Sequence, residues 1–102
     1  MASPDPGMTP ESWLLRVRGR VQGIGYRDAC VRGARALGLT GWVRNRGDDS
    51  VEVMLQGPPE RLAQMRALLR HCVPAARVEA LEVEVLPPPC PRFDDFERRP
   101  TL

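Results

Sequence analysis

The 102-residue sequence contains no lysine, so all fifteen of its basic residues are arginine. This absence excludes Schiff-base catalysis and any phosphate-binding loop that depends on a lysine. The sequence has one histidine, His71, so a zinc site with two histidine ligands cannot form within one chain. The net charge of +2 is too small to indicate a nucleic-acid-binding protein.

Cysteine is also scarce, with Cys30, Cys72 and Cys90 far apart in the chain. Their spacing fits neither a CxxC metal site nor a disulfide framework, so we expect free and mostly buried thiols. No stretch approaches the roughly 20 consecutive apolar residues of a membrane-spanning helix. The N-terminal residues lack the basic start and apolar run of a secretory signal. We therefore expect a cytoplasmic protein that does not associate with membranes.

The chain length allows one domain, and composition indicates where that domain begins. Residues 1–10 hold three prolines and almost no apolar side chain, which predicts a flexible N-terminal extension. Met8 within this stretch is an alternative start of translation. Residues 11–102 are predicted to form the single domain.

Hydrophobic periodicity over residues 11–102 predicts alternating strands and helices. Apolar and polar residues alternate over 12–18, 41–46, 51–56 and 77–86, as in half-buried strands. Helical spacing covers 26–38 and a second segment that starts at Pro58 and Pro59 and ends at His71. This order is that of an α+β ferredoxin-like sandwich, βαββαβ, with two helices on one face of a mostly antiparallel sheet. Residues 92–99 are predicted to add a short C-terminal strand.

A glycine-rich segment lies between the first predicted strand and helix and contains Gly19, Gly23 and Gly25. Such a segment can turn tightly and direct several main-chain N–H groups at one anion. The helix start that follows adds further donors, and Arg27 in its first turn can bind a phosphate through two N–H groups. The pattern alone is also consistent with an ordinary turn followed by a solvated arginine, which is the commoner arrangement.

Longer motifs distinguish between these interpretations. The segments GRVQGIGYR (residues 19–27) and GWVRN (residues 41–45) closely resemble the acylphosphatase family. The resemblance continues through DDSVEV (48–53), QGP (56–58) and FERRP (96–100), and so covers roughly residues 12–100. It implies an enzyme that hydrolyses small-molecule acyl phosphates to a carboxylate and inorganic phosphate, with no metal or organic cofactor. It also implies the same fold that the periodicity predicts.

The resemblance assigns roles to particular residues. Arg27 corresponds to the family's phosphate-binding arginine, and Asn45 to the asparagine that orients the attacking water. The amides that hold the phosphoryl oxygens correspond to the run Arg20, Val21, Gln22, Gly23, Ile24, Gly25 and Tyr26. The sequence departs from the family pattern at Asp48-Asp49, where Asp-Gly is usual. Because Asp tolerates positive φ better than most residues, we expect this turn to form with some strain.

Several alternatives stay open. The same site could serve a non-catalytic module that binds phosphate or carbamoyl phosphate. An RNA-binding sheet is a third reading, but it would need aromatic residues on its central strands, and residues 51–56 have none. The arginines at 18, 20, 44 and 46 either steer anionic substrates or are solvated strand ends. We expect Trp13 and Trp42 to pack at the core or its rim, the Asp48-Asp49 pair to be solvated turn carboxylates, and the protein to be a monomer.

Overall fold

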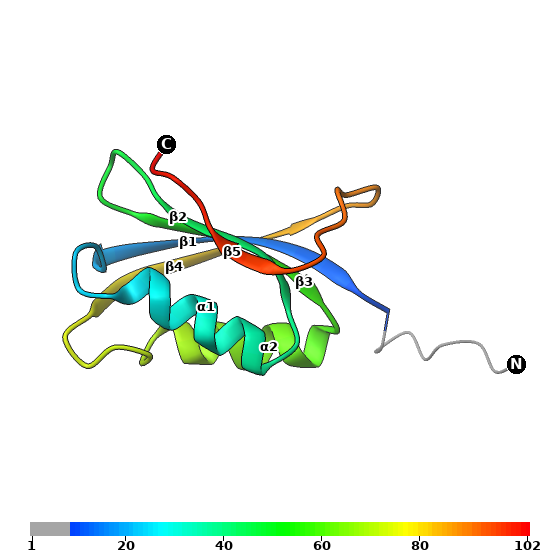
Figure 1. The fold of residues 1–102 in the computed structure, drawn as a ribbon, viewed down its shortest axis with the longest axis horizontal. Helices are drawn as coiled ribbons and strands as arrows, with labels where there is room; N and C mark the ends of the chain where they lie inside the picture. Colours follow the sequence, from blue (N-terminus) through cyan, green and yellow to red (C-terminus); the bar gives the residue numbers. More distant parts are fainter. Residues whose placement is uncertain (1–8) are drawn as a thin grey trace, which may run out of the picture.

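The computed structural model describes residues 9–102, so the predicted extension over residues 1–10 lies almost wholly outside the described residues. Five strands form one sheet with the order β4-β1-β3-β2-β5 (Figure 1). The strands are β1 (Glu11–Arg20), β2 (Thr40–Asn45), β3 (Val51–Gly57), β4 (Arg77–Leu86) and β5 (Phe96–Arg98). All neighbours pair antiparallel except β2 and β5, which run parallel.

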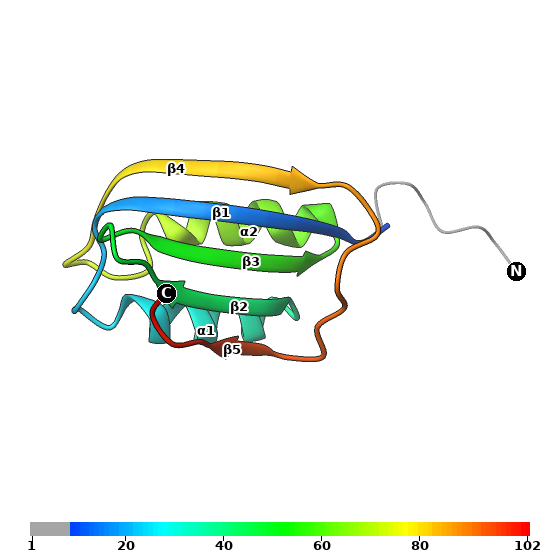
Figure 2. The ribbon, with the colours of Figure 1, turned by 90° about the horizontal axis from the view of Figure 1, so that it is seen from above.

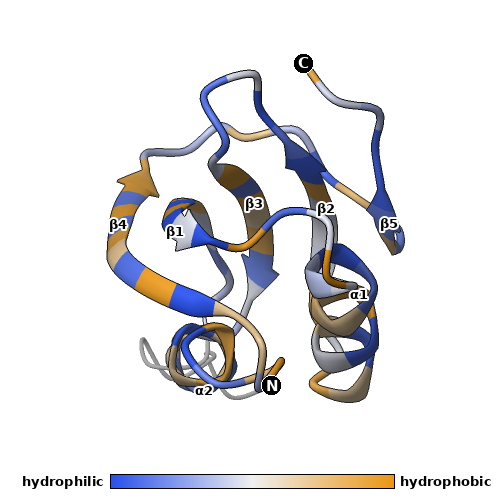
Figure 3. Ribbon diagram, turned by 90° about the vertical axis from the view of Figure 1, so that its left-hand side faces the viewer, coloured by the Kyte–Doolittle hydropathy of each residue, from blue (hydrophilic) through white to orange (hydrophobic). Residues whose placement is uncertain are grey.

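Two helices, α1 (Tyr26–Ala36) and α2 (Pro59–Leu69), cover one face of this sheet (Figures 2 and 3). The element order βαββαβ, with β5 as a short extra strand, confirms the predicted ferredoxin-like α+β sandwich. The helix α1 packs under β2 and β5, and α2 packs under β3. No helix of residues 9–102 covers the opposite face of the sheet.

The alternation of side chains along the strands decides which face the helices cover. On β1, Leu15 and Val17 are fully buried and face the helices, whereas Arg16 and Arg18 lie on the open face. Leu15 pairs with Val53 of β3 and with Val83 of β4, so apolar residues of neighbouring strands meet on the helix side. This register places the apolar core between the sheet and the two helices.

Both helices end slightly earlier than predicted. The helix α1 stops before Gly38, whose φ of +69° suits the left-handed C-terminal position. Its last carbonyls are satisfied there, since the amide of Leu39 donates to the carbonyl of Ala34 at 2.9 Å. The helix α2 begins with Pro58 at the N-cap, as predicted, and ends at Leu69. His71 therefore lies in the turn beyond α2 and not at its last position.

Three segments that are far apart in the sequence meet at one end of the sheet. The β1–α1 loop, the β2–β3 hairpin and the C-terminus all lie at the left-hand end in Figures 1 and 2. The C-terminal tail follows β2 to this end, because the amide of Arg99 donates to Val43 at 2.8 Å and that of Leu102 to Asn45 at 3.1 Å. The predicted site residues belong to this end.

Candidate active site

The loop between β1 and α1 owes its shape to two glycines in left-handed conformation. Gly23 has φ +77° and Gly25 has φ +78°. A Cβ atom added to either glycine would meet nothing within 4 Å, so backbone torsion and not crowding requires glycine there. The side chain of Ile24 between them packs against the hydrophobic core. The loop is therefore anchored on the core side and open on the side of its glycines.

The N-terminus of α1 presents main-chain donors beside this loop. Gly25 is the N-cap and has no side chain to cap the helix, and the first helical bond runs from Ala29 N to Gly25 O at 3.1 Å. The amides of the first turn thus have no acceptor within the helix, and they carry its partial positive charge. The buried hydroxyl of Tyr26 donates to the Leu69 carbonyl at 2.6 Å, which fixes this helix end against α2. Burial raises the pKa of Tyr26, so the hydroxyl stays a neutral donor.

Arg27 lies half-buried in the first turn of α1. Within residues 9–102 its guanidinium forms no ion pair. The adjacent carboxylate of Asp28 is engaged elsewhere, because it pairs with Arg98 of β5 at 2.8 Å. The guanidinium of Arg27 is therefore available to an anion at the helix start.

Asn45 is the last residue of β2, where the strand enters the hairpin. Its main-chain carbonyl accepts the amide of Leu102, which ties the C-terminal tail to this point. Its side-chain Oδ1 is buried and has no hydrogen-bond partner among the described residues. Because most buried side-chain acceptors are satisfied in native proteins, this oxygen marks a position where an external donor fits.

Three of the four arginines that flank the predicted site form ion pairs within the protein. Arg44 and Arg46 both pair with Glu52, and Arg18 pairs with Glu82 and Asp48. These three guanidinium groups are thus occupied by carboxylates of the protein. Arg20 is exposed and forms no ion pair with residues 9–102.

Glu52 is the centre of this charged network, although the sequence pattern alone predicts no role for it. It lies on the open face of β3 yet is only 4% exposed, because arginines from two neighbouring strands and the hairpin surround it. Its carboxylate is 2.6 Å from Arg44 and 3.3 Å from both Arg16 and Arg46. Burial alone would raise the pKa of Glu52, but the hydrogen bonds and charges of Arg44, Arg46 and Arg16 together outweigh it and lower the pKa.

The Asp48-Asp49 turn forms as predicted, with Asp49 at φ +70°. The amide of Arg46 donates to Ser50 O at 2.9 Å and that of Asp49 to Arg46 O at 3.2 Å, as in a three-residue hairpin loop that favours glycine at its left-handed position. Asp48 is more than a solvated carboxylate. It accepts hydrogen bonds from the hydroxyl and amide of Ser50, and these, with Arg16 and Arg18, lower its pKa to about 2.

The cysteines and Trp42 lie largely as the sequence predicts. The three cysteines are free, with Cys30 buried and the other two half-buried. Trp42 is only 7% exposed and lies beneath Arg44, whose guanidinium carbon is 4.5 Å from the ring centre.

Among the described residues, no three His, Cys, Asp or Glu side chains are placed to hold a metal ion. No helix in that part of the chain is long and apolar enough to cross a membrane.

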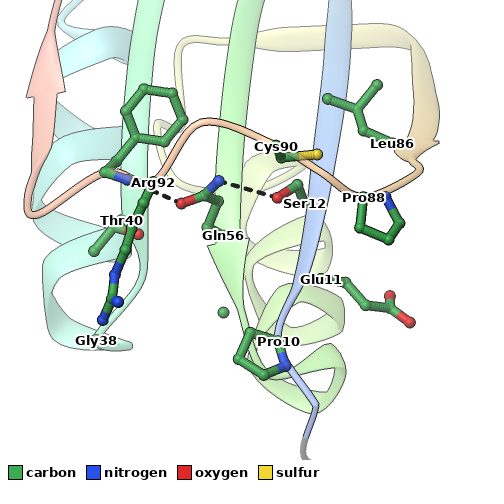
Figure 4. Close-up of a pocket in the computed structure, with 12 residues that line it drawn as sticks. Pro10, Glu11, Ser12, Gly38, Thr40, Gln56, Leu86, Pro88, Cys90 and Arg92 are labelled. Atoms are coloured by element: carbon green, nitrogen blue, oxygen red, sulfur yellow. Dashed lines mark hydrogen bonds between the residues drawn. The ribbon is translucent and has the colours of Figure 1, made fainter.

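Two of the hollows on the surface of the described residues lie at opposite ends of the sheet, and neither is lined by Arg27 or Asn45. One of about 430 Å³ borders the loop and is lined partly by Arg20, Gln22 and Asp49. The other, of about 580 Å³, lies at the far end of the sheet (Figure 4). There the amide of Gln56 donates to Ser12 Oγ at 3.0 Å and its oxygen accepts the amide of Phe93. None of the predicted site residues lines this second hollow.

Comparison with known proteins agrees with the motifs. A family model for acylphosphatases matches residues 13–98. An acylphosphatase of Polaromonas naphthalenivorans is 59% identical over 98 residues, which cover 96% of this chain and 97% of the relative. Acylphosphatase 1 of Ralstonia nicotianae is 67% identical over 89 residues, or 87% of each chain. The crystal structure of the Bacillus subtilis acylphosphatase superposes with a TM-score of 0.83 at 28% identity, over 87% of this chain and 98% of that one.

These matches span nearly the whole domain, including the loop, Arg27 and Asn45. Of the functions that the sequence left open, they support the enzyme over a binding module without activity. The chain therefore belongs to the acylphosphatase family and is a hydrolase of acyl phosphates.

Proposed function

We propose that Arg27 and the loop amides from Arg20 to Tyr26 hold the phosphoryl group of the acyl phosphate while Asn45 orients the attacking water. The observation that carries the proposal is the buried Oδ1 of Asn45, which has no hydrogen-bond partner among residues 9–102. A water O–H is a donor of the size and polarity that this oxygen needs. Asn45 is the last residue of β2, at the end of the sheet where the β1–α1 loop also lies (Figure 2).

The cradle supplies positive charge in three forms. Main-chain amides from the glycine-rich loop, the unpaired first-turn amides of α1 and the guanidinium of Arg27 lie next to one another in the chain. Charge spreads over the equatorial phosphoryl oxygens in the transition state, and fixed donors stabilise it without reorganising. Because Arg27 has no carboxylate partner among the described residues, its full charge acts on the substrate.

The bond changes need no acid catalyst. The water oxygen attacks phosphorus in line, and the phosphorus–oxygen bond to the acyl group breaks. The electron pair leaves with the carboxylate, and the water proton passes to solvent. The departing carboxylate has a conjugate acid with a pKa of roughly 4, so it leaves without protonation. Orientation of the water is then the remaining task, and one amide side chain can perform it.

The assay is the hydrolysis of benzoyl phosphate in EDTA, followed by ultraviolet absorbance. We expect Arg27→Ala to lower kcat/KM by about 10²–10³-fold and to weaken inhibition by inorganic phosphate, since it removes a transition-state charge partner. Asn45→Ala should lower kcat to a similar degree, with phosphate inhibition retained. The matched control is Arg61→Ala, which removes an exposed arginine from the first turn of α2.

Each variant is first checked for a native melting transition. If folded Arg27→Ala or Asn45→Ala keeps wild-type kcat/KM, the role assigned to that residue is wrong. If Arg61→Ala loses as much activity as Arg27→Ala, general surface charge and not the cradle accounts for the loss. Activity that disappears in EDTA would contradict a mechanism that assigns no step to a metal ion.

We also propose that residues 11–102 form a single monomeric domain in the cytoplasm. Val85 and Leu102 are the large apolar residues exposed within the described part of the chain, and they form no shared patch on one element. Three free thiols suit a reducing compartment. Sedimentation equilibrium at the monomer mass of 11.4 kDa, and fractionation of the source cells, check these two statements.

A further inference from the structure

The side chain of Gln22 joins the phosphate loop to the β2–β3 hairpin. Its Nε2 donates to the carbonyl of Arg46 at 2.9 Å and to the carbonyl of Ser50 at 2.8 Å. Both protons of the amide are thus used, and both bonds are short and half-buried. The sequence motif predicts a role only for the main-chain amide of Gln22, whereas the side chain points into the hairpin.

The two acceptors are the carbonyls that close the hairpin turn. Arg46 and Ser50 are already joined by the bond from Arg46 N to Ser50 O at 2.9 Å. Gln22 therefore binds a turn that is closed without it. Arg46 directly follows Asn45, and Gly23 directly follows Gln22. The Gln22 side chain thus connects the loop, just before Gly23, to Arg46, which is the residue after the proposed water-orienting Asn45.

We propose that the Gln22 side chain is a positioning residue that sets the Asn45 amide at the correct distance and angle from the phosphate cradle. This inference rests on the roles proposed above for Arg27 and Asn45. The loop amides and Asn45 come from different elements, and the sheet pairing of β2 ends at Asn45. The Gln22 bridge is a direct polar connection between the loop and the hairpin residues Arg46 and Ser50, the first of which follows Asn45. A displacement of about 1 Å between a bound group and its attacker can cost about 10²-fold in rate.

The chemistry of the bridge suits a glutamine. Its primary amide carries two N–H donors on one nitrogen, and each donor meets one of the two carbonyl oxygens. A methionine at position 22 has similar length but no donor. A glutamate would place a carboxylate against two carbonyl oxygens, and an asparagine is one methylene too short. The cradle itself uses main-chain amides, which all three substitutions retain.

The test is the steady-state kinetics of Gln22→Met and Gln22→Asn with benzoyl phosphate. We expect kcat to fall about 10–100-fold, while KM and competitive inhibition by inorganic phosphate change less than about threefold. A double-mutant cycle supplies the specific readout. In the Asn45→Ala background, Gln22→Met should lower kcat by less than about threefold, because there is no longer an amide to position.

A matched control is available at the other end of the sheet. The side chain of Gln56 also bridges elements, from β3 to Ser12 of β1 and to the amide of Phe93 (Figure 4). It lies far from the loop, so Gln56→Met should lose a comparable hydrogen-bonded bridge and keep the wild-type kcat. A similar loss of kcat in Gln56→Met would show that lost bridges act through general stability and would overturn the inference.

The other outcomes are also decisive. A folded Gln22→Met or Gln22→Asn enzyme with wild-type kcat overturns the positioning role. An equal loss of kcat with and without Asn45 does so too, because the effect would not pass through Asn45. If phosphate inhibition weakens in step with kcat, Gln22 acts on the cradle instead. Failure of the proposed function is distinguishable, since Arg27→Ala and Asn45→Ala would then keep activity regardless of Gln22.

Discussion

Replacing Glu52 with glutamine tests whether the charged network on the open face stabilises the fold. Glu52 is 4% exposed and is the shared partner of Arg16, Arg44 and Arg46. Glutamine keeps the shape of the side chain and one acceptor, but among residues 9–102 it leaves Arg44 and Arg46 without a counter-charge and Arg16 with Asp48 alone, 3.7 Å away. Removing one partner of a buried ion pair costs about 3–5 kcal/mol. Here the arginine side chains are 23–28% exposed, so water compensates part of that cost.

We therefore expect Glu52→Gln to lower the free energy of unfolding by about 2 kcal/mol, and the Tm by roughly 8–16 °C for a domain of this size. Urea unfolding followed by far-ultraviolet circular dichroism measures the first quantity, and a thermal melt measures the second. The matched control is Glu82→Gln on the edge strand β4. The side chain of Glu82 is 62% exposed and pairs with Arg18, so its loss should matter much less.

The pH dependence provides an independent check with a definite sign. The pKa of Glu52 is lowered in the folded protein from its ordinary value of 4.5. A lowered folded pKa contributes stability that is complete above about pH 4.5 and is lost as the pH falls through the folded value. The difference in unfolding free energy between wild type and Glu52→Gln should thus be largest near neutral pH and shrink in acid. The reasoning is refuted if that difference grows in acid, or if Glu52→Gln is no less stable than Glu82→Gln.

Two further predictions concern the hairpin turn and the thiols. Asp49→Gly should stabilise the protein by about 0.5 kcal/mol, because relief of the left-handed conformation slightly exceeds the entropy that glycine adds to the unfolded chain. Asp49→Val should destabilise it in the same urea titration, and a valine variant as stable as wild type would contradict the positive φ. The hydrogen bond from Cys30 lowers the pKa of Cys72 to about 7. Alkylation of Cys72 by iodoacetamide should therefore be half-maximal near pH 7, and Cys30→Ala should move that midpoint upward; an unchanged midpoint would contradict this cause.

The sequence predicted the fold because its signals are local. Alternation over residues 12–18 and 77–86 shows which strand faces are buried, and helical spacing marks the two helices. The ends of the helices were predicted less exactly. His71 was placed in α2, but that helix ends at Leu69, since the apolar stripe continues past the last helical turn through Cys72 into a loop that packs on the same core.

The candidate site was only partly predictable, because only some of its contacts are local in the sequence. The motif around Gly23 and Arg27 lies within one short segment, so its loop and helix start follow from residue types. The side chain of Gln22 could not be placed, because its acceptors lie 24 and 28 residues away in the hairpin. The role of Glu52 was missed because strand alternation marks it as an outward-facing residue, and outward usually means solvated.

The sequence by itself thus determined the elements, the buried faces, the glycines of the loop and the family to which the motifs point. Only the tertiary structure decided which charges neutralise one another and which polar atoms are left without partners. The strand order β1-β3-β2 brings Arg16 and Arg44 to either side of Glu52, and the β1–α1 loop brings Gln22 to the hairpin that follows Asn45. The physical reason is that periodicity is set by neighbours along the chain, whereas the partner of a side chain is set by which strands lie side by side.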